Sequence, residues 1–297
     1  MQSLTLESAI KKVPAVSWLR PWMRAKVYAG GLIVLVFIVV GMVGPMVAPY
    51  DPNKQQLELM LQAPQWFGGD HFLGTDNLGR DILSRIVYGA RISLLVAFAV
   101  VFISGFVGVG LGAVSGFFGG EVDFSIQKLV EVIWAFPPLL LAITIIAFLG
   151  QELHNLILAL VAQRWIPYCR VARGQSLSLR ARDFVSAARS LGASNSRIIL
   201  HHILPNLVQA SLVIGTFAMA SAIISEASLS FLGLGVPPEI PTWGTMLADG
   251  RIYVSTAWWL ALFPGLCIFV TVLGINLLGD ALRDILDPRL KRAGSGI

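Results

Sequence analysis

Apolar residues occur along this chain in long runs, and polar stretches separate them. Each run has about the 20 residues that a helix needs to cross the hydrocarbon core of a bilayer. We expect spanning helices at residues 27–48, 92–114, 126–149, 153–173, 207–228 and 258–278. The pattern therefore predicts an all-α polytopic membrane protein with six transmembrane helices and both ends of the chain on the same side.

The composition supports a membrane protein and argues against a soluble one. Of the 297 residues, 56% are hydrophobic and only 13% are charged, whereas a soluble domain has about 25% charged residues. The two cysteines, Cys169 and Cys267, lie far apart in or beside apolar segments and have no metal-binding or redox spacing. We expect them to be reduced structural thiols and expect no metal site.

The basic residues flank the apolar runs and divide unequally between the two sides of the predicted membrane. The N-terminal tail, the segment 170–206 and the residues after the last predicted span (279–297) together hold fifteen Lys and Arg, against five in the opposite loops. Because Lys and Arg are enriched in cytoplasmic loops, both termini are predicted to be cytoplasmic, with tails at residues 1–26 and 291–297. Charges that follow the topology in this way do not predict a nucleic-acid partner; the bilayer is the expected partner surface.

Residues 182–206 form a polar, Arg-rich stretch between the fourth and fifth predicted spans. Asp183 can cap a helix here, and Phe184, Ala188 and Leu191 fall on one face at i, i+4 and i+7. The stretch therefore begins with a predicted amphipathic helix outside the membrane.

Gly192 is placed to end this first helix, and Ser194 or Asn195 to cap a second short helix that runs to Pro205. Small residues in the stretch would let another protein surface approach the backbone closely. They are Ala187, Ala188 and Gly192. We therefore expect a docking element rather than an ordinary loop.

Charged residues inside the spans are candidates for function, because a charge in lipid is costly. Glu131 and Lys128 lie in the first turns of the third predicted span, and Arg164 lies in the middle of the fourth. Glu131 and Arg164 could pair to support packing, line a path through the membrane or serve a proton relay, while Lys128 can reach the interface. Pro137 and Pro138 interrupt the third span, where a kink could shape a cavity or let the helices splay.

The second predicted span contains Gly108 and Gly112 at the GxxxG spacing, which permits close helix packing in lipid. Ordinary glycine enrichment in membrane helices and a specific subunit contact explain this spacing about equally well.

No sequence pattern of a membrane enzyme is present. The chain has no HExxH, CxxC, P-loop or GxSxG motif. A serine protease within the membrane would need a Ser and a His at similar depth, but the four histidines lie outside or at the edge of the spans. We expect no catalytic site in this chain.

The sequence SAARSLG at residues 186–192, followed by ILP at 203–205, resembles the EAA loop of ABC importer permeases. In that loop E-A-A-x-x-x-G is followed at a fixed distance by I-x-L-P. The matching residues are Ala187, Ala188, Gly192, Leu204 and Pro205. Ser186 replaces the family's acidic residue and His202 replaces its isoleucine, so the side chain that makes the contact usually ascribed to the glutamate stays open.

Three further stretches resemble C-type permease subunits of the dipeptide, oligopeptide and nickel ABC importers. They are HFLGTDNLGRDILSRIVYGARISL at 71–94, SLSFLGLGVPPEIPTWGTML at 228–247 and FPGLCIFVTVLGINLLGDALRDILDP at 263–288. This resemblance covers most of the chain after residue 25. It implies the type I ABC importer permease fold, with the family's N-terminal region at 27–91 and the importer transmembrane domain at 92–290.

The resemblance also implies a larger assembly in the bacterial inner membrane. Such importers combine this permease with a homologous B-type permease, two cytoplasmic ATPases that bind ATP and Mg²⁺, and an external solute-binding protein. No cofactor is implied in this chain itself. A coupling helix at about residues 183–203 would dock on one ATPase, and the loops at 50–91 and 233–257 would receive the binding protein. The implied coupling residues are Ser186, Ala187, Ala188, Arg189, Leu191, Gly192 and Pro205.

Dipeptides or oligopeptides are the favoured solutes, because peptide systems are the commonest assignment in the family that the chain resembles. Nickel, glutathione, opines and oligosaccharides stay open, since the external protein does most of the selection there. A channel or an ion-coupled carrier would need a filter or several buried acids, and the sequence supplies neither. A membrane scaffold that docks a signalling partner through the Arg-rich stretch is the remaining alternative.

Overall fold

The structure is a computed structural model, and it describes residues 21–286. Within this part the regular structure is helical, apart from one isolated antiparallel β-bridge between Thr75 and Asp81. The helices are α1 (Pro21–Val47), α2 (Ile82–Phe118), α3 (Gly120–Trp134), α4 (Pro138–Leu149), α5 (Leu153–Arg180), α6 (Asp183–Ser190), α7 (Asn195–Ile198), α8 (Leu204–Phe231), α9 (Trp243–Gly250) and α10 (Trp259–Leu286). Shorter turns are η3 (Leu57–Leu59), the π-helical turn η4 (Ile199–Ile203) and η5 (Arg251–Tyr253).

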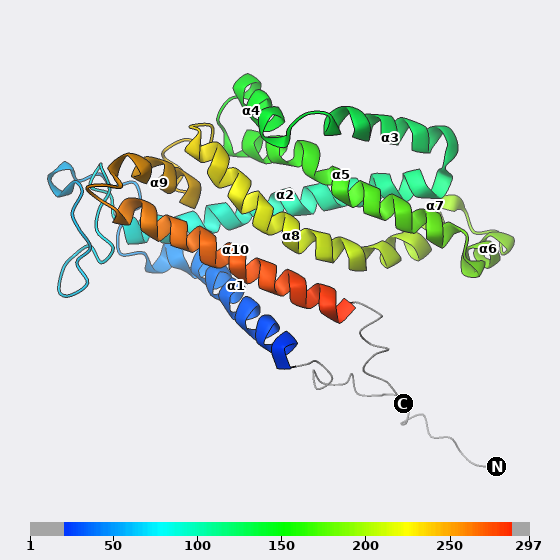
Figure 1. The fold of residues 1–297 in the computed structure, drawn as a ribbon, viewed down its shortest axis with the longest axis horizontal. Coiled ribbons are helices and arrows are strands. Elements are labelled where there is room, and N and C mark those ends of the chain that lie inside the picture. The colour runs from blue at the N-terminus through cyan, green and yellow to red at the C-terminus, as the bar shows by residue number, and fades with distance from the viewer. Residues whose placement is uncertain (1–20, 287–297) are drawn as a thin grey trace, which may run out of the picture.

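The long helices α2, α5 and α8 pack together along the long axis of the molecule (Figure 1). α1 and α10 form a packed pair on one side, and α3 and α4 lie against α5 on the other. The connection at residues 48–81 and α9 lie at one end, which we call the loop end. α6 and α7 lie at the opposite end, which we call the α6 end.

The predicted membrane-helix fold is confirmed, with the count of six spans approximate. α1, α2, the run from α7 to α8, and α10 are each long and apolar enough to cross a membrane. α3 and α4 pass that test only together, and they are bent by 86° at the break between them. α5 has 28 residues, so it is about 42 Å long, but it is too polar to pass the test by composition.

Two predicted boundaries are wrong. α2 begins at Ile82, ten residues before the predicted span, because Asp81 caps it and the polar residues Ser84 and Arg85 are buried in its first turns. The second short helix also does not end at Pro205. The π-helical turn η4 follows α7 and leads directly into α8. Pro205 lies in the first turn of α8, where its missing N–H is tolerated, so the helical path continues through this proline.

The glycines of α2 let it pack backbone to backbone against α5. A Cβ atom added at Gly108, Gly112 or Gly116 would come closer than 3.0 Å to a backbone carbonyl oxygen of α5. Such close approach over a glycine ridge is the packing that GxxxG spacings permit in lipid. The GxxxG spacing thus serves a contact within this chain, rather than either of the two explanations that the sequence offered.

The start of α1 and the end of α10 lie near each other, and the ammonium of Lys26 is 4.0 Å from the carboxylate of Asp284. The predicted tail residues before 21, and the C-terminal residues 287–297 with the predicted tail at 291–297, lie outside the described residues.

Candidate functional site

The helix α6 ends in a glycine turn of the Schellman type. Gly192 has φ +80°; its N–H donates to the carbonyl of Arg189, and the N–H of Ala193 donates to the carbonyl of Ala188, both at 3.0 Å. These two bonds satisfy carbonyls that the helix end leaves free. Ser194 then caps α7, since its hydroxyl accepts from the N–H three residues later at 3.4 Å. The predicted glycine stop is confirmed, and of the two predicted caps Ser194, not Asn195, caps α7.

One side of α6 packs against the rest of the chain. Val185 is completely buried in an apolar cluster with Phe117 of α2, Ile198 of α7 and Leu207 of α8. Ala188 is half-buried at the edge of that cluster. The remaining predicted coupling residues are exposed; these are Ser186, Ala187, Arg189, Leu191, Gly192 and Pro205. The segment therefore has a free face that points away from the bundle.

The predicted cap of the amphipathic helix is wrong. Asp183 is the first residue of α6 rather than its cap; Arg182 holds the cap position, and no side chain makes a capping bond there. Two residues of the predicted apolar face point outward, where a docking partner could cover them: Phe184 is 42% and Leu191 88% exposed. Val185, one residue after Phe184, takes the inward position. The exposed apolar residues belong to the free face.

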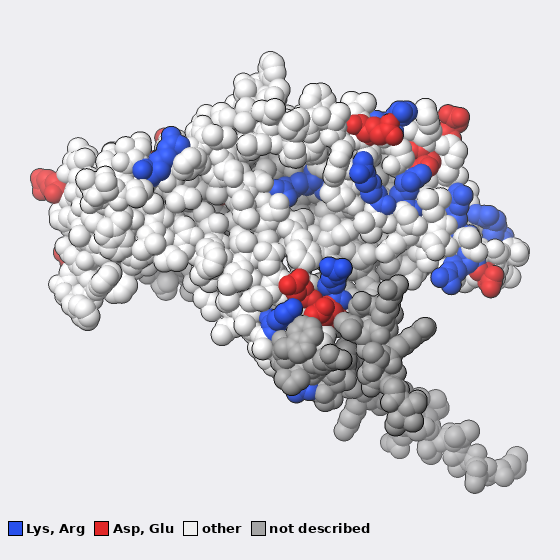
Figure 2. Space-filling model, in the orientation of Figure 1, with Lys and Arg blue, Asp and Glu red and all other residues white. Residues whose placement is uncertain are grey.

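Basic side chains gather toward the α6 end on the face shown in Figure 2. Five arginines are exposed in this region, on α5, α6, α7 and the turn between α5 and α6: Arg170, Arg180, Arg182, Arg189 and Arg197. Arg173 is half-buried, and its guanidinium donates two hydrogen bonds of 2.5 and 2.6 Å to the carboxylate of Asp123 in α3. Exposed arginines around an exposed helix suit contact with an acidic protein surface.

The break between α3 and α4 lies at the two prolines that the sequence singled out. α3 ends at Trp134 and α4 begins at Pro138, so Pro137 lies in the break. The side-chain amide of Gln163 in α5 donates to the carbonyl of Phe136 at 2.7 Å and to that of Ile133 at 3.1 Å. The neighbouring helix thus supplies hydrogen bonds that the prolines remove from the helix ladder.

A cavity of about 590 Å³ lies where this break meets α5 and α8. Apolar side chains form most of its wall, among them Trp134, Phe136, Leu160 and Leu229. Two residues that the sequence singled out line this cavity: Arg164, for which lining a path was one predicted role, and Pro137, where a kink was expected to shape a cavity.

The predicted ion pair between Glu131 and Arg164 is not formed. Glu131 accepts a hydrogen bond from Lys128 at 2.8 Å on the same helix, and its side chain is 60% exposed. The guanidinium of Arg164 donates to α8 instead, to the carbonyl of Ser221 at 2.9 Å, the hydroxyl of Ser225 at 2.6 Å and the carbonyl of residue 218 at 3.5 Å. Lys128, three residues from Glu131, is the nearer partner on the same helical face.

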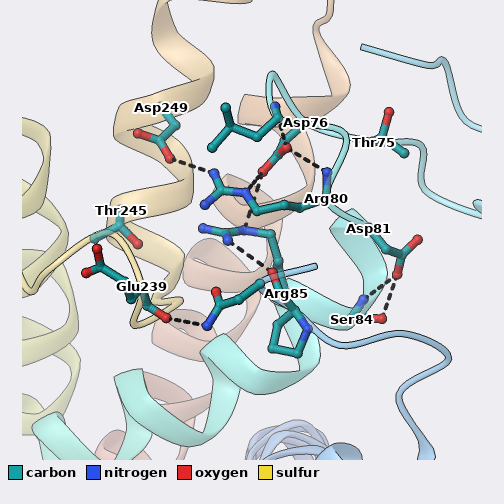
Figure 3. A network of polar contacts seen from close by, with 12 residues as sticks. Thr75, Asp76, Arg80, Asp81, Ser84, Arg85, Glu239, Thr245 and Asp249 are labelled. Atoms are coloured by element: carbon teal, nitrogen blue, oxygen red, sulfur yellow. Dashed lines mark hydrogen bonds and ion pairs between the residues drawn. The ribbon is translucent and has the colours of Figure 1, made fainter. Parts of the chain in front are cut away.

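A network of charged residues, buried except for the half-exposed Asp249, joins the segments at the loop end (Figure 3). The carboxylate of Asp76 accepts a bond of 2.6 Å from the guanidinium of Arg80 and lies 3.6 Å from that of Arg85. Arg80 also lies 3.6 Å from the carboxylate of Asp249 in α9, and Arg85 donates to the carbonyl of Pro52. Burial raises the pKa of the Asp249 carboxyl, and the two arginines oppose this shift. The network fixes the loop to α2 and α9.

A second buried carboxyl group connects α8 to α9. The Glu226 side chain is 1% exposed, and one of its oxygens accepts from the hydroxyl of Thr242 at 2.8 Å and from that of Ser230 at 3.0 Å. Thr242 is also the cap of α9.

The sequence reasoning missed the polar residues that hold these sites together. They are Gln163, Ser221, Ser225, Glu226, Asp76, Arg80, Arg85 and Asp249. The signal available for Arg80 and Arg85 was a pair of arginines within the GTDNLGRDILSR stretch, close to Asp76 and Asp81.

Two family models match the chain. The model described as binding-protein-dependent transport system inner membrane component matches residues 108–292. The model described as the N-terminal TM domain of oligopeptide transport permease C matches residues 22–64.

Curated relatives align over most of their own length. The di/tripeptide transport system permease protein DppC of Pseudomonas aeruginosa is 44% identical, with 89% of this chain and 88% of that protein covered. The oligopeptide transport system permease protein OppC of Bacillus subtilis is 40% identical, covering 88% and 85%. The glutathione transport system permease protein GsiD of Escherichia coli is also 40% identical, covering 96% and 97%.

A solved structure has the same fold over most of the chain. In the inward-facing MetNI methionine ABC transporter, one chain superposes with a TM-score of 0.53 at 17% identity, covering 71% of this chain and 96% of that chain. The sequence matches span more than half of the chain, and the helical fold agrees with them. The chain therefore belongs to the family of inner membrane components of binding-protein-dependent transport systems.

Proposed function

We propose that this chain is one of the two permease subunits of an ATP-driven importer of dipeptides or oligopeptides. The chain belongs to a family of transport components. Its curated relatives named for di/tripeptide and oligopeptide transport are 44% and 40% identical to this chain. ATP hydrolysis, with its bound ATP and Mg²⁺, belongs to separate subunits. A homologous B-type permease is the proposed partner within the membrane.

The free face of α6 is the observation that carries the coupling role. Its small and apolar residues Ala187, Leu191 and Gly192 are exposed, while Val185 holds the helix to α2, α7 and α8. A surface of this kind permits a second protein to approach the backbone and to move the bundle when it moves. Asp183 lies one turn before Ser186, so α6 still presents a carboxylate near the position where the family's acidic residue is missing.

The charge distribution supports the orientation that we propose. The exposed arginines gather at the α6 end, which we assign to the cytoplasm of a bacterial cell. The loop end, with the network around Asp76 and with α9, then faces outward, where the external solute-binding protein would dock. Both termini would be cytoplasmic.

Glutathione is the second candidate solute, because a permease named for glutathione transport is as similar to this chain as the oligopeptide relative is. Glutathione is itself a small peptide, so the two candidates share their chemistry. Binding measurements on the external protein would separate them.

The coupling role is tested by Gly192→Trp in the complete complex, reconstituted in lipid vesicles with its ATPases and binding protein. A Cβ atom at this position would meet nothing within 4 Å, so the large side chain would project from the free face rather than into the bundle. We expect solute-stimulated ATP hydrolysis to be lost while the chain still inserts.

Gly192→Asn is the matched control, because asparagine tolerates the left-handed conformation but adds little volume. It should keep most of the stimulation. Normal stimulation in the tryptophan variant would refute the coupling role, and failure of the chain to copurify with ATPases and a second permease would refute the proposed function as a whole.

A further inference from the structure

The cavity between α5, α8 and the α3–α4 break contains a guanidinium without an anionic partner. Within the described residues Arg164 forms no ion pair; its three hydrogen bonds go to two carbonyls and one hydroxyl of α8. A charged side chain at membrane depth is expensive, and such residues usually pair or line a path for a solute. The position of Arg164 in the wall of a cavity of about 590 Å³ meets the second condition.

We infer that Arg164 and Gln163 form an intramembrane binding site for the carboxyl-terminal end of a peptide in transit. This inference rests on the proposed function and adds the chemical group that the permease itself recognises.

Arg164 has donors to spare for a carboxylate. A guanidinium has five N–H groups in a planar fork, and the hydrogen bonds of Arg164 use three of them. The bonds to α8 also fix the orientation of the side chain, so it does not need to be ordered when a solute binds. Hydrogen bonds between a guanidinium and a carboxylate are among the strongest in proteins, and two can form in parallel.

Gln163 supplies a complementary acceptor. Its amide nitrogen is used by the carbonyls of Ile133 and Phe136, while its side-chain oxygen is buried without a hydrogen-bond partner. An amide oxygen accepts from an N–H group, and every peptide that does not end in proline carries a backbone N–H next to its terminal carboxylate. A buried acceptor left without a partner costs free energy, which a bound peptide N–H would recover.

The rest of the cavity fits variable side chains. Its wall is mainly aromatic, proline and leucine, including Trp134, Phe136, Pro138 and Leu229. Ligand pockets are commonly about 300–1,000 Å³, lined by apolar groups with a few polar groups that set orientation. Apolar walls would accept many different side chains of a bound peptide. Arg164 and Gln163 would select the terminal carboxylate, which all peptides share. A metal cation is a poor occupant, because the fixed charge of Arg164 would repel it.

The test measures protection of an introduced thiol in the complete complex held in lipid nanodiscs. Ser221 lines the cavity and is exposed, and it bonds Arg164 through its backbone carbonyl, so Ser221→Cys leaves that bond in place. The rate of modification by a water-soluble thiol reagent is followed with increasing dialanine or dialanine amide, which lacks the carboxylate. Native Cys169 is buried and Cys267 half-buried, so the unmodified chain gives the background.

We expect half-protection at a concentration about tenfold lower for dialanine than for its amide, since a hydrogen bond to a charged group contributes about that factor. Adding Arg164→Gln should remove this preference by weakening dialanine alone. Arg164→Lys should keep part of it, because the positive charge remains without the fork. Lys128→Gln removes a cation from α3 outside the cavity and should leave the preference unchanged.

Equal protection by the two compounds, a preference that survives in Arg164→Gln, or no protection by either would each overturn the inference. Dialanine uptake into vesicles is measured in parallel with the binding protein and ATP present. Uptake without a carboxylate preference at the cavity refutes this site and leaves the proposed function standing. Absence of uptake by the unmodified complex counts against the proposed function itself.

Discussion

The contact between α2 and α5 predicts a sharp difference between two alanine substitutions in the same helix. Gly112→Ala would place a Cβ atom 2.7 Å from the Cβ of Ala172, and closer still to the carbonyl oxygen of Cys169. Gly110 lies two residues away, where an added Cβ would meet nothing within 4 Å. A backbone carbonyl cannot rotate aside as a long side chain can, so Gly112→Ala requires the two helices to separate.

The expected magnitude follows from the comparison of the two variants. Replacing glycine by alanine within a helix stabilises it by about 1 kcal/mol in water, and this gain applies to both positions. It therefore cancels in the difference, which isolates the steric conflict. Forcing an additional methyl group into close packing costs about 1–3 kcal/mol. We expect Gly112→Ala to be less stable than Gly110→Ala by this amount.

The assay is reversible unfolding of the purified chain in lipid–detergent micelles by sodium dodecyl sulfate, followed by tryptophan fluorescence. The free energy of unfolding is compared for the native chain and the two variants at the same lipid composition. Equal stability of the two variants would refute the argument, because it would mean that the glycine ridge is not in contact with α5. A loss of stability in Gly110→Ala alone would reverse the assignment of the helix faces.

Two further substitutions test the polar contacts that hold the sites. Gln163→Ala should lower the stability of the chain by about 1–3 kcal/mol, since carbonyls at the α3–α4 break lose their donor; Gln209→Ala, which removes an amide bonded to an exposed carbonyl, is the control. Equal unfolding midpoints for these two would contradict the role of Gln163. Asp76→Asn should loosen the loop end, because removing one partner of a buried ion pair costs about 3–5 kcal/mol, and trypsin should then cleave at exposed Lys54 several times faster than in the control Asp70→Asn. An unchanged cleavage rate would show that the network does not hold the loop.

Hydropathy was sufficient to find most of the membrane helices, but not where polar residues are buried. The eleven residues before the predicted second span contain Asp81, Ser84 and Arg85, and their polarity indicated a loop. In the structure these side chains are buried and bonded to one another or to the loop, so the helix extends through them. A sequence pattern records polarity, whereas burial of a polar residue depends on partners supplied by distant segments.

The same reason explains the incorrect partner for Arg164. From the sequence, Glu131 was the available opposite charge in a neighbouring span. The actual acceptors are mainly backbone carbonyls of α8, which every residue carries and no side-chain pattern reveals. The coupling segment was easier to predict, because its glycine turn and its cap at Ser194 depend on residues within a few positions of each other. Local bonds are visible in a sequence, and contacts between helices largely are not.

The packing also indicates which wall of the cavity moves if the cavity changes size during transport. α5, which carries Arg164, is held to α2 by backbone contacts at Gly108, Gly112 and Gly116. The opposite wall is held more loosely, since α3 buries only Val130, and α4 buries only two of its residues within this chain. Separating α5 from α2 would break close packing along the whole glycine ridge. Displacing α3 and α4 would change the 86° bend and break a few polar contacts to α5, from Gln163 to the break and from Arg173 to Asp123. The energetically easier change is therefore movement of the α3–α4 wall relative to a fixed Arg164.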